Sequence, residues 1–220
     1  MDKKEVVKAL KTAKENSPKR NFKQRIDMIL TLKNIDVKKP DQQVDAYINL
    51  HYPKAKKQKV CGLVGPELYE QAKSVFDEAI HIDDFPKYKE NKDKKKLAQQ
   101  YDFFVAQGDV MQKVAQNFGK AFGPRGKMPN PKAGCVVPPN ANLKSLYDRL
   151  QTTEHLKVKS QKMFQAAIGY EDTDEEQVID NALTIYNQLI HHLPQEKNNV
   201  KEIVFKLTMG KPVKLSEVKD

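Results

Sequence analysis

Cysteine, tryptophan and long apolar runs are scarce or absent in this chain of 220 residues. Its two cysteines, Cys61 and Cys135, lie far apart, and neither has a second Cys or a His at metal-ligand spacing. We therefore expect no disulfide framework and no metal site, and both thiols should be core residues in a reducing cytosol. No run of about 18 apolar residues occurs, and the first five residues do not begin a signal peptide, so neither a membrane span nor export is expected.

Positive charge is what the chain has in excess. It carries 39 Lys and Arg against 29 Asp and Glu, which gives a net charge of +10 and a pI near 9.3. This balance favours a polyanionic partner, with nucleic acid first, although a merely soluble basic protein can have the same composition. The length allows one large domain or two small ones.

Two patterns of hydrophobicity divide the chain. Towards both ends, alternating strands at about 22–32, 44–52, 156–168 and 203–209 accompany amphipathic helices, which predicts antiparallel strands covered on one side by helices. From about residue 60, short apolar strings alternate with helical stretches, one of which Asp109 should cap, and this order predicts a parallel sheet. We expect an α/β protein of two domains: a discontinuous α+β sandwich of residues 1–65 and 156–220, and an inserted domain of residues 66–155.

The segment 119–134 concentrates glycine, proline and positive charge, which predicts a long loop of fixed shape. Its backbone amides, beside four cations, suit contact with RNA phosphates. A Walker loop would need Gly where Ala121 stands and Ser or Thr where Met128 stands, and a dinucleotide fingerprint fails as well. The tetrad 123–126 could imitate the GXXG loop of KH domains. The candidate contacts in this segment are Lys120, Gly123, Arg125, Gly126, Lys127 and Lys132.

A second candidate is the stretch 206–210 at the end of the last strand. Gly210 would let the backbone approach a partner closely, and the Thr208 hydroxyl could donate to a phosphate or accept from a ribose 2′-hydroxyl. An ordinary strand ending at glycine has the same pattern. The lysines at 87, 89, 92, 94, 95 and 96 are interpreted as a solvated helix face. No nucleophile, base and orienting group stand at a recognisable spacing, so we expect no active site, no cofactor and no enzyme.

Three motifs together resemble a known family. Residues 123–134 (GPRGKMPNPKAG) resemble the signature of the large-subunit ribosomal protein L-one family in its archaeal form, residues 206–210 (KLTMG) its C-terminal motif, and residues 20–24 (RNFKQ) its N-terminal motif. The resemblance covers essentially the whole chain in the right order. It implies that the inserted domain is Rossmann-like with three layers, and that the protein is cytoplasmic, associated with the ribosome and monomeric when free of it.

The resemblance also implies a function and a surface. The partners would be the mobile stalk of large-subunit ribosomal RNA, exit-site tRNA whose deacylated form it helps to release, and the protein's own messenger RNA as a target of repression. Phe22 would pack on a ribose or base, and Asp27 would accept hydrogen bonds from 2′-hydroxyls or base amino groups. Bacterial relatives usually have Glu at the Asp27 position and His where Gln165 aligns. The implied RNA-binding residues are Arg20, Phe22, Asp27, Lys162, Lys206, Thr208, Met209 and Gly210.

Two alternatives stay open beside a structural ribosomal RNA binder. One is a free regulatory RNA-binding protein, which co-sedimentation with large subunits would distinguish. The other is an enzyme whose Rossmann-like domain holds a nucleotide, which both failed loop patterns disfavour.

Overall fold

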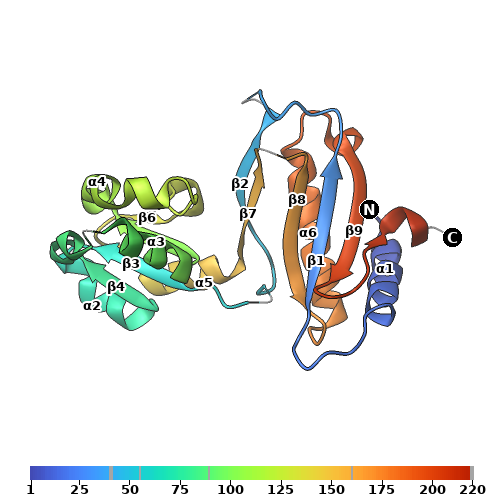
Figure 1. Ribbon diagram of the computed structural model, residues 1–220, viewed down its shortest axis with the longest axis horizontal. Coiled ribbons are helices and arrows are strands. Elements are labelled where there is room, and N and C mark those ends of the chain that lie inside the picture. The colour runs from blue at the N-terminus through green and yellow to red at the C-terminus, as the bar shows by residue number, and fades with distance from the viewer. Residues whose placement is uncertain (40–41, 55, 89, 160, 219–220) are drawn as a thin grey trace. The chain divides into compact units, whose positions relative to one another are not determined.

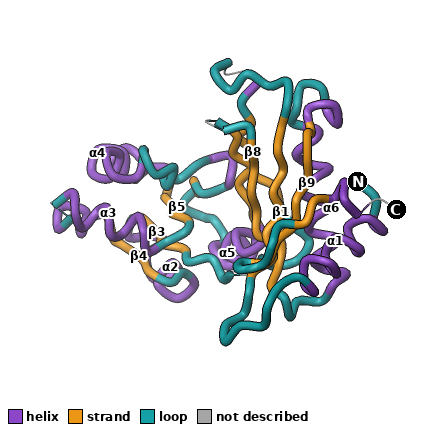
Figure 2. Tube along the Cα trace, turned by 45° about the vertical axis from the view of Figure 1, so that its right-hand side comes forward, coloured by secondary structure: helices purple, strands orange, loops and turns teal. Residues whose placement is uncertain are grey.

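The computed structural model describes residues 1–39, 42–54, 56–88, 90–159 and 161–218. The chain divides into two compact units, Met1–Lys56 with Thr152–Asp220 (unit 1) and Lys57–Gln151 (unit 2). The N-terminal helix and the C-terminal segment lie side by side in unit 1 (Figures 1 and 2). Within the described ranges, no helix is both long enough and apolar enough to cross a membrane.

The centre of unit 1 is a four-stranded antiparallel sheet in the order β10-β9-β1-β8. Because successive residues of a strand point to opposite faces, Ile26, Met28 and Leu30 of β1 are fully buried on one face. The helices pack on that face, and Figure 1 shows α6 behind β1 and β8. The elements are α1 (Lys3–Glu15), β1 (Arg25–Leu32), β8 (Met163–Tyr170), α6 (Glu175–His191), β9 (Val200–Leu207) and β10 (Val213–Lys214).

A separate antiparallel pair, β2 (Val44–Asn49) and β7 (Thr153–Val158), completes unit 1. Its inward residues Val44, Ile48, Leu156 and Val158 join the same apolar core. The single strand-like stretch expected at 156–168 is therefore two strands, since β7 ends at Val158 and β8 begins at Met163.

Unit 2 contains a parallel sheet in the order β4-β3-β5-β6 with helices between its strands. Four phenylalanines of its own apolar core pack against one another in edge-on, tilted and stacked pairs: Phe85, Phe104, Phe118 and Phe122. The elements are β3 (Val60–Val64), α2 (Pro66–Val75), β4 (Glu78–His81), α3 (Asn91–Gln100), β5 (Phe103–Gln107), α4 (Met111–Phe122), β6 (Val136–Val137) and α5 (Leu143–Thr152).

The α/β class predicted from the sequence, with one antiparallel and one parallel sheet, is confirmed. The boundaries differ from those expected at 65/66 and 155/156, because β3 pairs with β4 and β5 and so lies in unit 2. Asp109 does not cap α4: it lies in a short 3-10 turn, and Val110 occupies the cap position without a side-chain hydrogen bond.

We predict that residues 1–56, joined by a short linker to residues 152–220, fold without unit 2, because each unit buries its own apolar cluster. Circular dichroism should show mixed helix and strand with a cooperative urea transition. A spectrum of an unfolded chain would show that the two units depend on each other.

Candidate nucleic-acid interface

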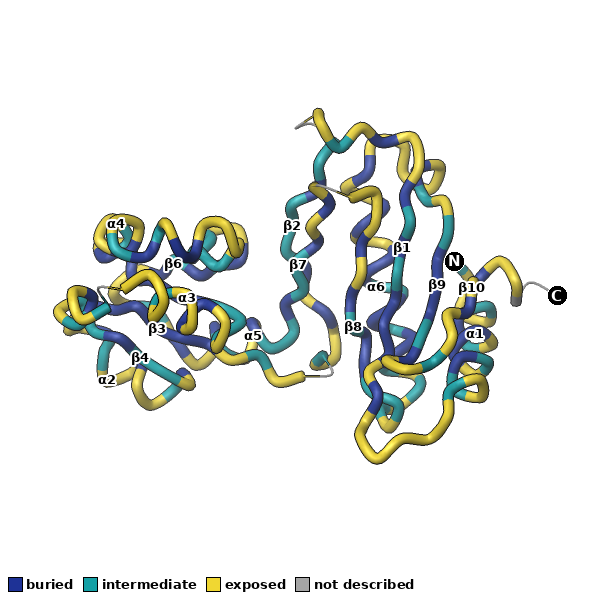
Figure 3. Tube along the Cα trace, in the orientation of Figure 1, coloured by how far each residue is buried: buried dark blue, intermediate teal, exposed yellow. Residues whose placement is uncertain are grey.

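Three segments far apart in sequence meet where β1 begins and where β8 and β9 end. We call this the Gln24 end of the sheet, made of residues 17–25, 169–173 and 206–210; it is the lower end of the sheet in Figure 1. Most of the segment leading into β1 is exposed, and Gln24 is the buried position within it (Figure 3). Two of the three sequence motifs, 20–24 and 206–210, are thereby brought together.

The side chain of Gln24 joins these segments through hydrogen bonds. Its Oε1 accepts from the backbone N–H of Met209 at 3.2 Å and from the Ser17 hydroxyl at 3.2 Å. Its Nε2 donates to the Pro18 carbonyl at 3.1 Å and lies 3.5 Å from a carboxylate oxygen of Glu171. A side chain that is 1 % exposed thus satisfies its polar atoms with three different parts of the chain.

Thr208 joins the end of β9 to the start of β1 through hydrogen bonds with the Arg25 backbone. Its Oγ1 accepts from the Arg25 backbone N–H at 2.9 Å and lies 3.3 Å from the Arg25 carbonyl, to which the hydroxyl can donate, while the Thr208 N–H donates to the same carbonyl at 3.0 Å. The hydroxyl that the sequence suggested for direct RNA contact therefore also has a structural role. One lone pair is left for a ligand.

Asp27 lies beneath Arg25 on the sheet face opposite the helices. Arg25 Nε is 2.7 Å from Asp27 Oδ1, and the two side chains are 48 % and 6 % exposed. Oδ1 is covered from solvent and accepts no aligned hydrogen bond from the described residues. Lys206 is the cross-strand neighbour of Asp27 on β9. Arg25 Nη2 lies 3.4 Å from the other carboxylate oxygen, Oδ2, so the guanidinium lies against both oxygens of Asp27.

Phe22 and Met209 carry the apolar contacts that this end offers. They are 51 % and 56 % exposed, although large apolar side chains are usually buried. An exposed aromatic ring beside polar strand ends can stack on a nucleotide base, a contact worth about 1–3 kcal/mol.

Gly210 and Lys23 complete the Gln24 end. A Cβ on Gly210 would lie 3.2 Å from Ser17 and Leu207, so the glycine permits close packing inside the protein as well as against a partner. Lys23 Nζ is 2.5 Å from Asp172 Oδ2; this hydrogen bond raises the pKa of Lys23 and lowers the pKa of Asp172. Arg20 is exposed in the same segment.

Lys162 does not lie beside these residues. Its carbonyl accepts from the N–H of Leu32, at the opposite end of β1 from Arg25. A strand rises about 3.3 Å per residue, so the two ends are about 23 Å apart. The family surface inferred from sequence is thus split between two ends of one sheet.

The segment 119–134 differs from the expected loop. Lys120 lies in α4, which continues to Phe122. The amides of Gly123, Arg125, Gly126 and Lys127 all donate to backbone carbonyls, so they form no open nest for a phosphate. Arg125 Nη1 donates to the Ala121 carbonyl and Lys127 Nζ to that of Asp102. A phosphate would have to compete with these internal hydrogen bonds for the four amides, and exposed Lys120, Arg125 and Lys132 are the cations this segment offers.

The lysine-rich stretch 87–96 includes the start of α3. Lys87 pairs with Asp84 at 2.6 Å, while Lys92, Lys95 and Lys96 are exposed, in agreement with a solvated helix face. Lys89 lies outside the described residues.

The crevice where a doubly wound sheet would bind a nucleotide is already occupied. It lies beyond the carboxyl ends of β3 and β5, where strand order reverses. There the buried Gln107 accepts from the Gly65 N–H at 3.0 Å and donates to Glu67 at 3.3 Å, and Pro66 has no N–H to offer a phosphate. A nucleotide phosphate at this place would have to displace these hydrogen bonds.

Both thiols of the chain lie buried in unit 2. Burial raises the pKa of Cys61, and burial raises the pKa of Cys135 to about 11, so both thiols stay protonated near neutral pH.

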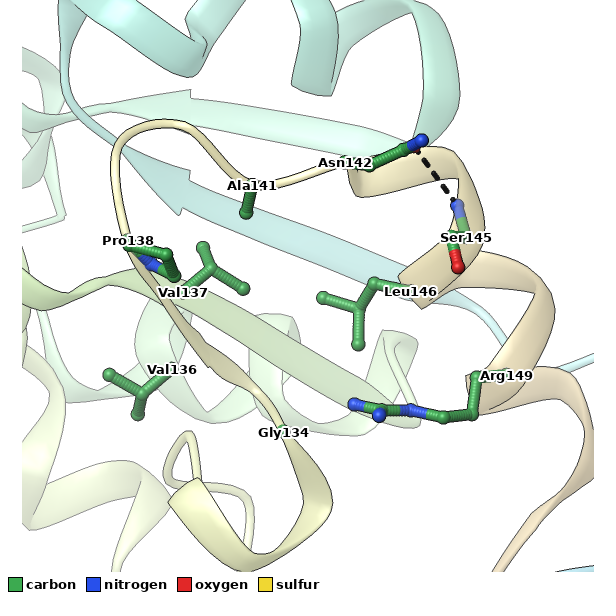
Figure 4. Close-up of a pocket in the computed structure, with 9 residues that line it drawn as sticks. All are labelled: Gly134, Val136, Val137, Pro138, Ala141, Asn142, Ser145, Leu146 and Arg149. Atoms are coloured by element: carbon green, nitrogen blue, oxygen red, sulfur yellow. Dashed lines mark hydrogen bonds between the residues drawn. The ribbon is translucent and has the colours of Figure 1, made fainter.

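A cavity of about 320 Å³ lies between β6 and α5 (Figure 4). Val137 and Leu146 are among its lining residues, and Arg149 is its one ionisable group. Among the described residues, no cluster of His, Cys, Asp and Glu could hold a metal.

Together these features define a binding protein: a basic chain with a preformed strand-end surface and a filled nucleotide crevice. Residues 10–211 match the Ribosomal protein L1p/L10e family. The chain is 38 % identical over 213 residues to "Large ribosomal subunit protein uL1" of Nanoarchaeum equitans, covering 95 % of this chain and 98 % of the relative. It is 34 % identical over 220 residues to the protein of the same name from Methanocaldococcus jannaschii, covering 100 % and 98 %.

The chain therefore belongs to the Ribosomal protein L1p/L10e family. Membership confirms the resemblance on which the sequence motifs agreed. It also confirms the prediction that the protein is not an enzyme, since the family is one of ribosomal proteins.

Sequence reasoning missed Gln24 and Glu171 as organisers of the site. Gln24 stands at an inward position of the alternating stretch 22–32, between apolar residues. This inward position was the signal in the sequence for a structural role, because a buried polar side chain needs hydrogen-bond partners. Which partners it finds depends on segments 147 and 185 residues away.

We predict that Gln24→Ala destabilises the protein by about 2 kcal/mol or more, since it leaves the Met209 N–H and the Pro18 carbonyl without their partner. The matched control is Gln165→Ala, an exposed residue of β8, which should change stability by less than about 0.5 kcal/mol. Urea unfolding followed by circular dichroism measures both. Equal effects of the two substitutions would contradict the role given to Gln24.

Proposed function

We propose that this protein is a constituent of the large ribosomal subunit and binds the mobile stalk of large-subunit ribosomal RNA near the exit site through the Gln24 end. There it would assist release of deacylated tRNA, and it would also repress translation of its own messenger RNA by binding a stalk-like structure. We further propose that it is a cytoplasmic protein, monomeric when free of the ribosome. Family membership supports the ribosomal role, and the relatives' name supports the large subunit.

The observation that carries the RNA assignment is the meeting of the 20–24 and 206–210 motifs on one preformed surface. Phe22 and Met209 are exposed on two of the segments that Gln24 joins, where the ring could stack on a base and the methionine could pack on a base or ribose. Thr208, Gly210 and the adjacent backbone come close to any RNA seated between them. A surface that is already ordered loses less conformational entropy when it binds.

Phosphate binding to Arg25 would expose Asp27 to the RNA. A phosphate approaching the exposed guanidinium would draw it away from Asp27. The uncovered carboxylate could then accept hydrogen bonds from 2′-hydroxyls or base amino groups, which distinguish RNA from other polyanions. An isolated buried carboxylate is costly, so Asp27 would be uncovered only when such donors replace Arg25.

We predict that Phe22→Ala weakens binding to stalk RNA by about tenfold or more, because one stacked base contributes about 1–3 kcal/mol. Binding to an unrelated RNA of equal length should change by less than about twofold. The matched control is Tyr52→Ala, which removes another exposed aromatic ring of unit 1 outside the segments 17–25, 169–173 and 206–210 and should alter neither affinity.

Filter binding at one fixed salt concentration measures these affinities, and co-sedimentation with large subunits tests the ribosomal placement. A Phe22 variant that loses the same affinity for both RNAs would show that the ring does not contribute to recognition. Stalk-RNA binding without co-sedimentation would favour a free regulatory protein.

A further inference from the structure

The opposite end of the unit 1 sheet also brings three segments together. There β1 ends, and β8 and β9 begin; we call it the Asn199 end, made of residues 33–39, 161–162 and 195–201, at the top of the sheet in Figure 1. The N–H of Leu32 donates to the Lys162 carbonyl at 2.8 Å, and the N–H of Lys33 donates to the Asn199 carbonyl at 2.8 Å. Lys162, Lys33 and Lys201 therefore lie on or next to the ends of three neighbouring strands.

Asn199 joins the two segments that carry Lys33 and Lys201. It is fully buried, and its Nδ2 donates to the carbonyls of Lys33 at 3.1 Å and Asn34 at 3.4 Å, while Oδ1 accepts from the Gln195 N–H at 2.6 Å. Asn34 (φ 56°) and Glu196 (φ 48°) are the two residues other than glycine with positive φ among those described. Such backbone costs free energy and persists where surrounding contacts impose it, often at functional surfaces.

The charges at the two ends differ. At the Gln24 end, Lys23 and Arg25 are each paired with a carboxylate. At the Asn199 end the lysines are exposed, and the structure gives them no ion pair with any described residue; they are Lys33, Lys38, Lys39, Lys162, Lys197 and Lys201. Of the described acids there, Asp36 and Glu196 are exposed and Glu202 is paired with Lys214. At the Gln24 end, Lys19, Arg20 and Lys206 also have no ion pair with a described residue, so the Asn199 end has twice as many such cations, six against three.

We propose that the Asn199 end is a second RNA surface, which binds the phosphate backbone of an RNA segment without reading its sequence. This rests on the proposed function and extends it, because the family motifs 20–24 and 206–210 lie about 23 Å away at the other end of β1. Unit 1 then holds RNA at both ends of one sheet. The Gln24 end supplies recognition, and the Asn199 end supplies electrostatic affinity.

The chemistry of the Asn199 end fits phosphate better than protein. A protein partner would need an apolar centre, and Met163 is the one large exposed apolar side chain at this end among the described residues. Lysines are mobile point charges that suit phosphates at varied positions. Their strand-end anchors lie on neighbouring strands about 5 Å apart, close enough for several to face one stretch of backbone.

The test is the salt dependence of RNA binding by the full chain. The variant Lys33→Gln, Lys162→Gln, Lys201→Gln removes three charges from the Asn199 end. The matched control Lys3→Gln, Lys4→Gln, Lys11→Gln removes three exposed charges from α1 in the same unit. Affinity for stalk RNA and for an unrelated RNA is measured from 50 to 200 mM salt.

Each lost phosphate contact lowers the slope of log affinity against log salt by about 0.7–0.9, so the Asn199-end variant should lower it by about 2 to 3 for both RNAs. The α1 control should lower it by less than about 1. Hydroxyl-radical footprinting should show a backbone segment that loses protection in the Asn199-end variant and keeps it in Phe22→Ala.

An unchanged slope, or equal reductions in the two triple variants, would overturn the proposal. Binding to polyglutamate, a mimic of an acidic protein, is measured for the same variants. If the Asn199-end variant loses polyglutamate binding while its RNA slope is unchanged, the proposal is overturned and an acidic protein partner is indicated. If the wild-type chain shows no preference for stalk RNA, the proposed function fails, while the slopes on unrelated RNA still test the Asn199 end.

Discussion

A single buried side-chain amide joins the three segments of the Gln24 end, which is the proposed RNA-binding surface. Gln24 has donors and an acceptor that water cannot reach, and such groups are costly unless each finds a partner. Its partners come from the segment after α1, the turn after β8 and the end of β9. Satisfying one amide therefore fixes three segments, and the exposed positions of Phe22 and Met209 follow from that arrangement.

A buried side-chain amide organises each end of the sheet, but the two ends present different side chains. At each end a buried amide, Gln24 or Asn199, joins loops that no regular ladder connects. The loops at the Gln24 end present an aromatic ring and two paired cations, whereas those at the Asn199 end present six lysines without an ion pair to any described residue. Paired charges give directional hydrogen bonding, and unpaired charges give long-range attraction that salt weakens. The length of the central strands sets the distance between the two ends of the sheet.

Much of the fold was predictable from the sequence because it depends on local periodicity. The alternation at 22–32 predicted β1, the amphipathic patterns towards both ends predicted helices such as α6, and the change of pattern near residue 60 indicated a second sheet. Asp109 was a wrong prediction because a suitable capping residue cannot show where a helix begins when a 3-10 turn precedes it. The glycines of 119–134 likewise do not reveal that their amides are used internally.

The site was predictable in composition but not in geometry. Motifs near the two ends of the chain named Phe22, Thr208 and Gly210, and the antiparallel pairing of β1 with β9 brings them together. Lys162 was associated with the same group, yet the register of β1 against β8 places it at the other end. Register depends on contacts between distant segments, so no local pattern could have separated Lys162 from Phe22.

Amide hydrogen exchange at Met209 and Arg25 tests most directly whether the recognition surface is preformed. These N–H groups donate to Gln24 Oε1 and Thr208 Oγ1 in the free protein. If the surface is preformed, both amides exchange slowly without RNA, and stalk RNA adds little protection to them. Rapid exchange in the free protein, with protection only in the complex, would show that the surface forms on binding and would contradict the role assigned to Gln24.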